Sequence, residues 1–175
     1  DISKVQRLLL AQSRRREVER SLLDGFLNSQ ECTYDYFGVL ERDDRGNDLL
    51  RIHSRLAAAD TSKDTESDEI SRQYRMNDLA NLYGKCLTTK SAVIANDVLP
   101  RTLPKEELPG EPSSIQNFLG IPLIVKEQVL GMIGKVNSIS PVLPEDVDFL
   151  EPIIVTCNTI IQSFSQSRAF EEQLR

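Results

Sequence analysis

The chain has little of two residue types on which protein chemistry often depends. Its 175 residues contain one histidine and three cysteines. The cysteines, Cys32, Cys86 and Cys157, lie far apart without a C-x-x-C pair, which argues against a disulfide framework and favours a reducing compartment. Because His53 is the only imidazole, a Cys/His zinc site would need ligands from distant segments, so we expect no structural metal.

Long apolar runs and an excess of positive charge are also missing. No apolar run approaches the roughly 20 residues that cross a bilayer, so we expect no membrane insertion in this segment. The formal net charge is −6, and no basic stripe carries interleaved aromatic residues. We therefore expect no direct nucleic-acid binding. The chain does not begin with Met and has no signal-peptide pattern, so we expect a cytoplasmic piece of a longer protein.

Both ends of the sequence have the periodicity of amphipathic helices. We predict one helix over residues 2–28 and another from Pro144 to the end, with Pro152 bending the second or ending its first turn. Apolar residues of the second helix follow a heptad spacing, which is typical of a seam between helices. We therefore predict a homodimer whose interface contains Ile2, Val5, Leu9, Ile154, Cys157, Ile161 and Phe164.

The middle of the chain is typical of antiparallel strands. Tyr34 to Leu56 flank a turn-rich Asp/Gly/Asn cluster and predict a hairpin, in which His53 would point outward as a surface residue. Residues 60–71 read as a polar loop, 76–89 as a helix and 92–95 as a short strand. A second hairpin is predicted from strands 118–125 and 129–137, with its turn at 126–128.

Glycine and proline interrupt this second hairpin. Pro122 cannot donate to the ladder and indicates an edge, a bulge or an unpaired position. Gly131 and Gly134 indicate that something approaches the strand closely, either a packed helix or a small ligand, and packing is the favoured explanation. The proline-rich stretch 97–117 before the hairpin is expected to be the lid of a pocket.

The order "SAVIANDV", a proline-rich loop, "FLGIPLIVKEQVLGMIGKVNS" and "DVDFLEPIIVTCNTII" resembles a GAF domain, particularly those coupled to histidine kinases and diguanylate cyclases. The matching positions are Gly120, Pro122 and Leu123, then Gly131 to Asn137, then Phe149 to Ile153. Lys135 departs from the pattern, because apolar or small residues are commoner there.

The resemblance implies an α+β fold with an antiparallel sheet of five or six strands. The N- and C-terminal helices would pack on one face, and a loop-roofed pocket would lie on the other. The expected organisation is a linker or dimerisation helix over 1–20, the GAF domain over 21–165 and the start of a signalling helix over 166–175. Candidate ligand-binding residues are Tyr36, Asn96, Asp97, Phe118, Gly120, Ile133 and Asn137. A purely structural role for them stays open, because Asn and Asp in turns often bond their own backbone.

The residues also limit the chemistry expected of such a domain. No cysteine adjoins His53 for bilin attachment, the Asn-Lys-x-x-x-Phe signature of cyclic-nucleotide binders is missing, and His53 is a poor axial ligand for haem. We therefore expect no known cofactor and no catalysis. The leading hypothesis is a regulatory domain that senses an unidentified small ligand and signals through its terminal helices to a C-terminal output domain. The alternatives are a ligand-free dimerisation spacer and a thiol enzyme of the free methionine sulfoxide reductase type.

Overall fold

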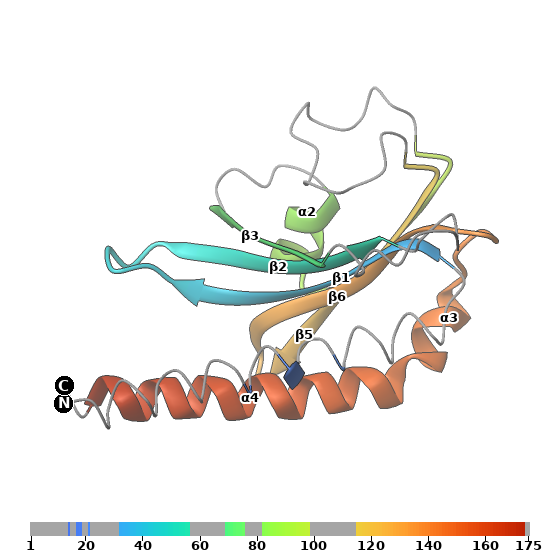
Figure 1. Cartoon of the computed structure of the whole chain (residues 1–175). Helices are drawn as coiled ribbons and strands as arrows, with labels where there is room; N and C mark the ends of the chain where they lie inside the picture. Colours follow the sequence, from blue (N-terminus) through green and yellow to red (C-terminus); the bar gives the residue numbers. More distant parts are fainter. Residues whose placement is uncertain are drawn as a thin grey trace.

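A six-stranded antiparallel sheet forms the centre of the structure, in the strand order β3-β2-β1-β6-β5-β4 (Figure 1). The computed structural model describes residues 32–56, 69–75, 82–98 and 115–173, together with Arg14, Glu17, Val18 and Ser21, which are helical. The predicted α+β architecture is confirmed. The strands are β1 (Cys32–Arg42), β2 (Asp48–Leu56), β3 (Glu69–Arg75), β4 (Val93–Asn96), β5 (Asn117–Val125) and β6 (Gln128–Ser138).

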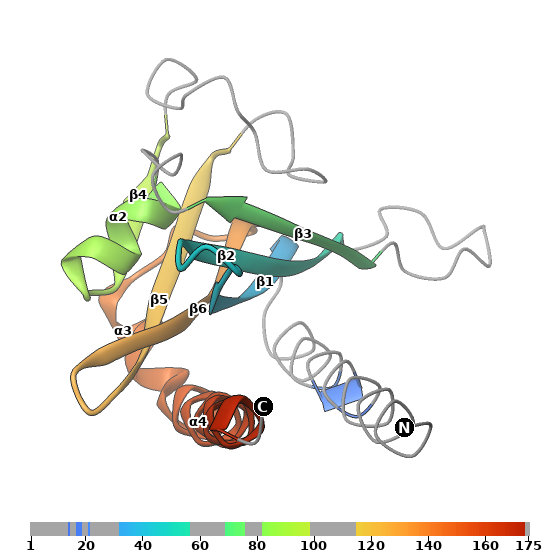
Figure 2. The same ribbon diagram turned by 90° about the vertical axis from the view of Figure 1, so that its left-hand side faces the viewer.

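Helices lie on both faces of the sheet. Helix α2 (Leu82–Thr89) covers one face, and α4 (Glu151–Gln173) runs across the other after the short helix α3 (Pro144–Phe149) (Figures 1 and 2). Because neighbouring residues of a strand point to opposite faces, each strand contributes to two separate cores. Most of the helix expected over residues 2–28 lies outside the described residues.

The two cores differ in composition. The α2-side core contains Tyr34, Tyr36, Leu50, Ile52, Tyr83, Cys86, Leu87, Val93, Ile115, Phe118, Met132 and Val136. The α4-side core contains Phe37, Val39, Leu119, Ile121, Leu123, Ile133, Val142, Leu150, Cys157 and Ile161. Strands β5 and β6 supply residues to both, so they form the wall between the two cores.

The β5–β6 hairpin is confirmed with slightly longer strands than predicted. Val125 pairs with Gln128, so Lys126 and Glu127 are the two central residues of the turn. Their φ angles are +47° and +66°, the left-handed values that a tight type I′ hairpin turn requires. The ammonium group of Lys90 donates a hydrogen bond of 3.0 Å to the Glu127 carbonyl and ties this turn to the residue after α2.

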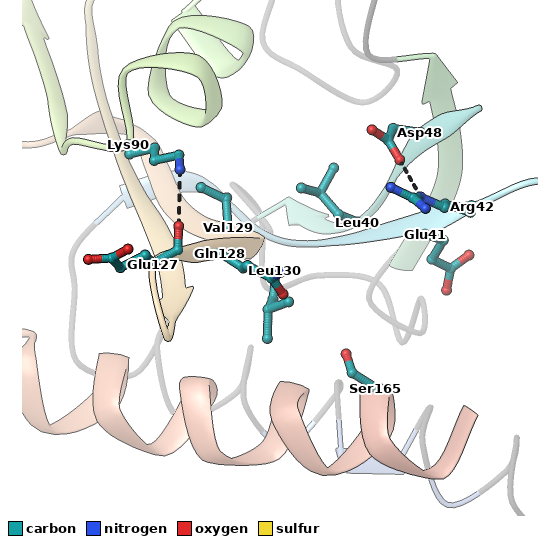
Figure 3. Close-up of a pocket in the computed structure, with 10 residues that line it drawn as sticks. All are labelled: Leu40, Glu41, Arg42, Asp48, Lys90, Glu127, Gln128, Val129, Leu130 and Ser165. Atoms are coloured by element: carbon teal, nitrogen blue, oxygen red, sulfur yellow. Dashed lines mark hydrogen bonds and ion pairs between the residues drawn. The ribbon is translucent and has the colours of Figure 1, made fainter. Parts of the chain in front are cut away.

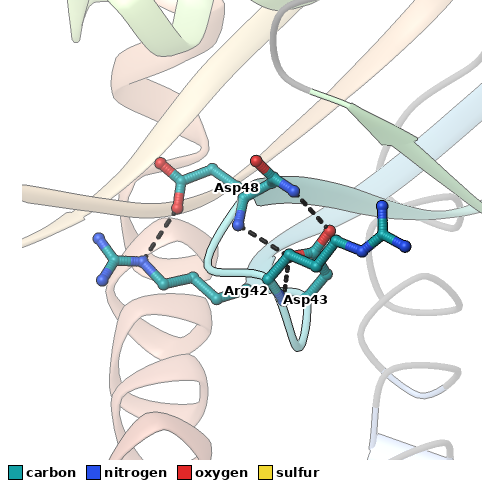
Figure 4. A network of polar contacts seen from close by, with 5 residues as sticks. Arg42, Asp43 and Asp48 are labelled. Atoms are coloured by element: carbon teal, nitrogen blue, oxygen red, sulfur yellow. Dashed lines mark hydrogen bonds and ion pairs between the residues drawn. The ribbon is translucent and has the colours of Figure 1, made fainter.

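The β1–β2 hairpin is also confirmed, and its turn is organised by Asp43 (Figure 4). The Asp43 carboxylate accepts hydrogen bonds from the backbone N–H groups of Arg45 (2.9 Å) and Asn47 (2.8 Å). The Asn47 side-chain amide donates a third bond of 2.9 Å. These bonds lower the pKa of Asp43, and the bond from the Asn47 side-chain amide has the largest effect.

Two expectations about the middle of the chain need correction. Residues 69–71, predicted as part of a loop, begin β3, which pairs antiparallel with β2. This edge strand carries few apolar residues, so its sequence lacks a strong strand pattern. The short strand predicted over 92–95 is instead Val93–Asn96. Of the predicted helix 76–89, the part from Leu82 to Thr89 is confirmed, and residues 76–81 lie outside the described ranges.

The heptad stripe of α4 faces its own sheet. The helix is interrupted between α3 and α4 at Leu150, which is fully buried. The interruption lies two residues before Pro152, in agreement with the prediction that this proline bends the helix or ends its first turn. Cys157 and Ile161 are completely buried, and Ile154 packs partly against the same core. Our assignment of Cys157 and Ile161 to a dimer interface was therefore wrong. Their periodicity indicates a buried stripe, and the chain itself covers it.

Candidate functional site

The face of the sheet beneath α2 is filled by an aromatic cluster made of Tyr36, Tyr83 and Phe118. The Tyr83 ring meets the other two edge-on, with centroids 4.9 Å from Tyr36 and 5.0 Å from Phe118. The three side chains are at most 2% exposed. Edge-to-face contacts of this kind add stability beyond burial alone. These described side chains therefore pack against one another as a hydrophobic core would.

Gly134, which was predicted to allow close approach, and Gly120 make room for this cluster. A Cβ at Gly134 would lie 2.2 Å from the Tyr36 hydroxyl oxygen and 2.0 Å from the Leu119 carbonyl oxygen. The same hydroxyl donates a buried hydrogen bond of 3.0 Å to that carbonyl. A Cβ at Gly120 would lie 2.9 Å from the Phe118 ring. The predicted close approach is present at both Gly131 and Gly134. At Gly131 a packed helix supplies it through Ile161 of α4, as preferred, whereas at Gly134 the Tyr36 side chain and the β5 backbone supply it.

Asparagine side chains join the ends of β4, β5 and β6 beside this core. Asn96 makes two hydrogen bonds of 2.9 Å with the backbone of Val142, one as donor and one as acceptor. Asn117 makes the same reciprocal pair with Ser138, at 3.0 Å and 2.7 Å. The Asn137 side chain accepts a bond of 2.7 Å from the backbone N–H of Gln116. We call Asn96, Asn117 and Asn137 the asparagine junction; it connects strands β4 and β5 to the segment that leads into α3.

The candidate ligand-binding residues fall into three groups. Tyr36, Phe118 and Gly120 lie together on the α2 side. Asn96 and Asn137 belong to the asparagine junction, and Asp97 is exposed with a φ of +55°. Ile133 lies in the α4-side core, so its grouping with the others was wrong. The physical reason is that residue 133 has the opposite parity to Gly134 in β6. Ligand binding by the remaining residues stays a prediction.

Sequence reasoning missed Tyr83 as the third member of the aromatic cluster. Its helical spacing with Cys86 and Leu87 indicated a buried position, but not which strand residues it would meet. That pairing depends on how α2 crosses β5 and β6, which local sequence does not encode. Among the described residues, no group of three or more His, Cys, Asp or Glu side chains could hold a metal ion.

A second polar feature lies on the α4 side of β1, β2 and β6. Asp35 is fully buried, and neither of its carboxylate oxygens has a hydrogen-bond partner. Burial raises the pKa of Asp35 to about 8. Lys135, the residue that departs from the family pattern, is 4% exposed and lies opposite Asp35 in the strand register.

His53 belongs to the same face and is 4% exposed, so the prediction that it is a surface residue was wrong. It does point away from Ile52, as strand alternation requires, but this face of the sheet is also covered. The guanidinium group of Arg51 donates a hydrogen bond to Nε2 of His53. Arg51 also donates a bond of 2.9 Å to the Glu41 carboxylate, in an ion pair that is largely buried.

The two described cysteine side chains lie on opposite sides of the sheet. Cys86 belongs to the α2-side core and Cys157 to the α4-side core, and both are free thiols. Burial raises the pKa of each thiol to about 12. A thiol with such a pKa is almost entirely protonated near neutral pH and is a poor nucleophile.

A groove of about 540 Å³ opens where the β1–β2 and β5–β6 hairpins end above α4 (Figure 3). Its walls come from the ends of two hairpins and from α4. The lining residues are Leu40, Glu41, Arg42, Asp48, Lys90, Glu127, Gln128, Val129, Leu130 and Ser165. None of the candidate residues predicted from the sequence lines it.

The profile of the GAF domain family matches residues 13–162, which is most of the chain. With the six-stranded sheet and its covering helices, this match places the protein in the GAF domain family. No curated protein shows a significant match to the sequence. None of the described helices is long and apolar enough to cross a membrane.

Solved structures of several GAF-like proteins share the fold. A type II free methionine-R-sulfoxide reductase from Thermoplasma acidophilum is 18% identical, with a TM-score of 0.58 over 86% of this chain and 96% of that one. Residues 122 to 287 of a methyl-accepting chemotaxis protein are 19% identical, with a TM-score of 0.57 over 90% and 98%. The GAF domain of a two-component sensor histidine kinase from Bacillus halodurans is 13% identical, with a TM-score of 0.55 over 87% and 96%.

Proposed function

We propose that this GAF domain is a non-catalytic regulatory module of a larger cytoplasmic signalling protein. A structural change on the α2 side of the sheet would alter the position of α4. Helix α4 would transmit this change to an output domain such as a histidine kinase or a diguanylate cyclase. The observation that carries the proposal is the double role of β5 and β6. On one face they carry Phe118 of the aromatic cluster and Gly134 beside it. On the other face they carry Leu119 and Ile133, which belong to the α4-side core.

The asparagine junction supplies a second physical connection. Asn96 ends β4, and its amide bonds the backbone of Val142, two residues before α3 begins. A shift at the end of β4 would therefore move the start of the α3–α4 segment. Such coupling needs only that a ligand binds two arrangements of the helix with different affinity.

A melting-temperature screen with nucleotides, amino acids and 2-oxoacids tests ligand sensing. A ligand of the folded state present at a hundred times its dissociation constant should stabilise the protein by about 2.7 kcal/mol. The same screen is repeated on Gly120→Val, which crowds the aromatic cluster, and on Ser91→Ala, an exposed control. Stabilisation that survives in the control and disappears in Gly120→Val supports sensing on the α2 side.

Hydrogen exchange then tests the coupling. In the presence of a stabilising compound, amide exchange in residues 151–165 of α4 should change, although the ligand binds the opposite face. An unchanged α4 would contradict the relay. If no compound stabilises the protein, the ligand-free dimerisation spacer replaces the sensing function; the dense packing of Tyr36, Tyr83 and Phe118 favours this second candidate.

A homodimer is part of the proposal, through surfaces other than the buried stripe of α4. Phe149 at the end of α3 and Val155 in α4 are 69% and 57% exposed and offer apolar contacts outside the monomer core. The mass of the protein in solution, measured by light scattering, should correspond to two chains. The variant Phe149→Asp with Val155→Asp should convert it to one chain that still unfolds cooperatively, with a melting temperature that no longer depends on protein concentration.

The thiol chemistry of the reductase class is not part of this proposal. Cys86 and Cys157 have raised pKa values and lie on opposite faces of the sheet. Incubation of the reduced protein with free methionine-R-sulfoxide and dithiothreitol should give no more methionine than a protein-free control. Turnover that is lost on alkylation would overturn the non-catalytic function.

A further inference from the structure

Asp35 lies on the α4 side of β1, an inner strand of the sheet between β2 and β6. It is completely buried, and neither of its carboxylate oxygens accepts a hydrogen bond. Among the described residues it is the one buried carboxyl group. Buried polar groups are almost always hydrogen-bonded, so a buried carboxyl group without a partner destabilises the fold. Neither the aromatic cluster nor the asparagine junction uses this group.

Lys135 is placed to become the partner of the ionised carboxylate. It lies directly opposite Asp35 in the antiparallel pairing of β1 with β6, so the two side chains share one face of the sheet. Cβ atoms at such positions are roughly 5 Å apart, a distance that the flexible four-carbon stem of a lysine spans. Lys135 is buried and takes part in other interactions, but the Asp35 oxygens accept no hydrogen bond from it. The two residues are therefore neighbours that are not hydrogen-bonded to each other.

Strand β2 lies on the other side of Asp35. Arg55 is the register partner of Asp35 there, and His53 lies opposite Phe37, the next residue of β1 on this face. His53 is buried and accepts a hydrogen bond from Arg51. Strand β1 separates β2 from β6. A cation supplied by β2 would therefore leave β6 in its present position.

The described residues of the helices bring no further charge to Asp35. Helix α4 has no charged residue between Pro152 and Ser167. In the N-terminal helical segment, Arg14 and Glu17 are exposed. Burial is thus the main influence on Asp35, and it raises the pKa of this carboxyl group to about 8. The group is therefore neutral in weakly acidic solution and ionised in more alkaline solution.

Strand β6 connects Lys135 to α4. Gly131, on the same face of this strand, is the position where Ile161 of α4 approaches the backbone. The helix packs on β5 and β6, beneath the sheet in the view of Figure 1. A change in the position of Lys135 therefore acts on a strand that supports the helix.

We propose that Asp35 is a proton-binding site that couples the pH of the solution to the packing of α4. In the protonated state the carboxyl group is neutral, and Lys135 keeps its present interactions. Loss of the proton to water leaves a buried carboxylate, which draws the Lys135 ammonium group toward β1 and changes how β6 supports the helix. The two arrangements differ in their affinity for one proton, which is all that such a switch requires. This site does not rest on the ligand sensing proposed beneath α2, although it acts on the same helix.

The direct test is a pH titration of the whole chain, labelled with ¹³C and ¹⁵N, from about pH 5 to about pH 9.5. The side-chain carboxyl carbon of Asp35 should shift with a midpoint at about pH 8, whereas exposed carboxyl groups titrate near pH 4. Backbone carbonyl carbons of residues 131–136 in β6 and 157–162 in α4 should shift with the same midpoint. An Asp35 that is already ionised at about pH 6, or an α4 that does not follow its titration, would overturn the proposal.

The variant Asp35→Asn identifies the group responsible. The amide has nearly the same shape as the carboxyl group but does not ionise, so the α4 shifts at about pH 8 should disappear. Shifts that persist in this variant would come from another group, such as His53, and would contradict the proposal. The titration of the wild-type chain decides the question even if the variant does not fold.

The variants Lys135→Met and Arg55→Met separate the two positions opposite Asp35. Lys135→Met keeps a long apolar side chain but removes the ammonium group. The Asp35 midpoint should then rise by about one pH unit, a tenfold weaker acidity, and the α4 shifts should be lost. Arg55→Met is the matched control at the β2 position and should retain the α4 shifts. Loss of these shifts in Arg55→Met, or their survival in Lys135→Met, would overturn the proposal.

Discussion

The two faces of the sheet differ in the residue types that cover them. The α2 face is closed by interlocking aromatic rings, and its two tight glycines fit a single arrangement of Tyr36. The α4 face has mainly aliphatic residues where the helix covers it, with Phe37 as the one aromatic residue among the fully described core positions. It carries Asp35, Lys135 and His53 where β1, β2 and β6 meet. Rigid ring packing fixes the shape of one face, whereas buried ionisable groups make the other sensitive to conditions.

The tightest packing on the α2 face predicts the largest effect. Gly134→Ala would place a Cβ within 2.0 Å of the Leu119 carbonyl oxygen, which is backbone and cannot rotate away. We expect a loss of about 3 kcal/mol or more in the free energy of unfolding, measured by urea denaturation. Gly38→Ala is the matched control on the same face, because its Cβ would meet only side-chain atoms, of Leu50 at 3.0 Å, Met132 at 3.3 Å and Ile52 at 3.6 Å. Equal stability of the two variants would contradict this account of the face.

On the α4 face, Ile161 joins the helix to the sheet. It is fully buried and contacts the strand at Gly131, so Ile161→Ala should cost about 3 kcal/mol by leaving a cavity. Thr159→Ala, at an exposed position of the same helix, should change the stability by less than about 0.5 kcal/mol. Both values come from urea denaturation. A small effect of Ile161→Ala would mean that α4 is not held on the sheet by this residue.

The buried Asp35 should make the stability of the α4 face depend on pH. Its pKa rises from an ordinary value of 3.8 in the unfolded chain to about 8 in the folded protein. The stability of the folded state that depends on a protonated Asp35 is therefore fully present below the unfolded pKa and is lost as the pH rises through the folded pKa. Raising the pH from about 5 to about 7 should therefore lower the free energy of unfolding by about 3 kcal/mol. Asp35→Asn removes the ionisation at nearly constant shape. The difference between wild type and variant should therefore change with pH; a constant difference would contradict a protonated Asp35.

The sequence predicted what depends on local pattern. The 118–137 hairpin followed from two apolar runs around a short turn, and the packing role of Gly131 and Gly134 followed from glycine inside strands. Strand alternation gave the correct side for His53, but it could not show that this side is covered. The heptad stripe of Cys157 and Ile161 likewise predicted burial without identifying the covering surface.

The groove could not be predicted, because it depends on where pairing stops. Leu130 looks like any other residue of an apolar strand, and its bulge is visible only from the β5–β6 register. The edge strand β3 was missed for a related reason. It is held by pairing to β2 rather than by an apolar pattern of its own.

The smallest effect concerns the turn that both faces share. Lys126 and Glu127 adopt left-handed φ angles, which cost little for Asn and Gly but more for other residues. The variant Lys126→Asn with Glu127→Gly should raise the free energy of unfolding by about 1 kcal/mol. The bond from Lys90 is kept, because it ends on the carbonyl of residue 127 and not on its side chain. Gln128→Gly is the control, since this strand residue is not among those with positive φ, and it should lower the stability. If the double variant is instead destabilised in a melting experiment, Lys126 and Glu127 do not adopt this turn in solution.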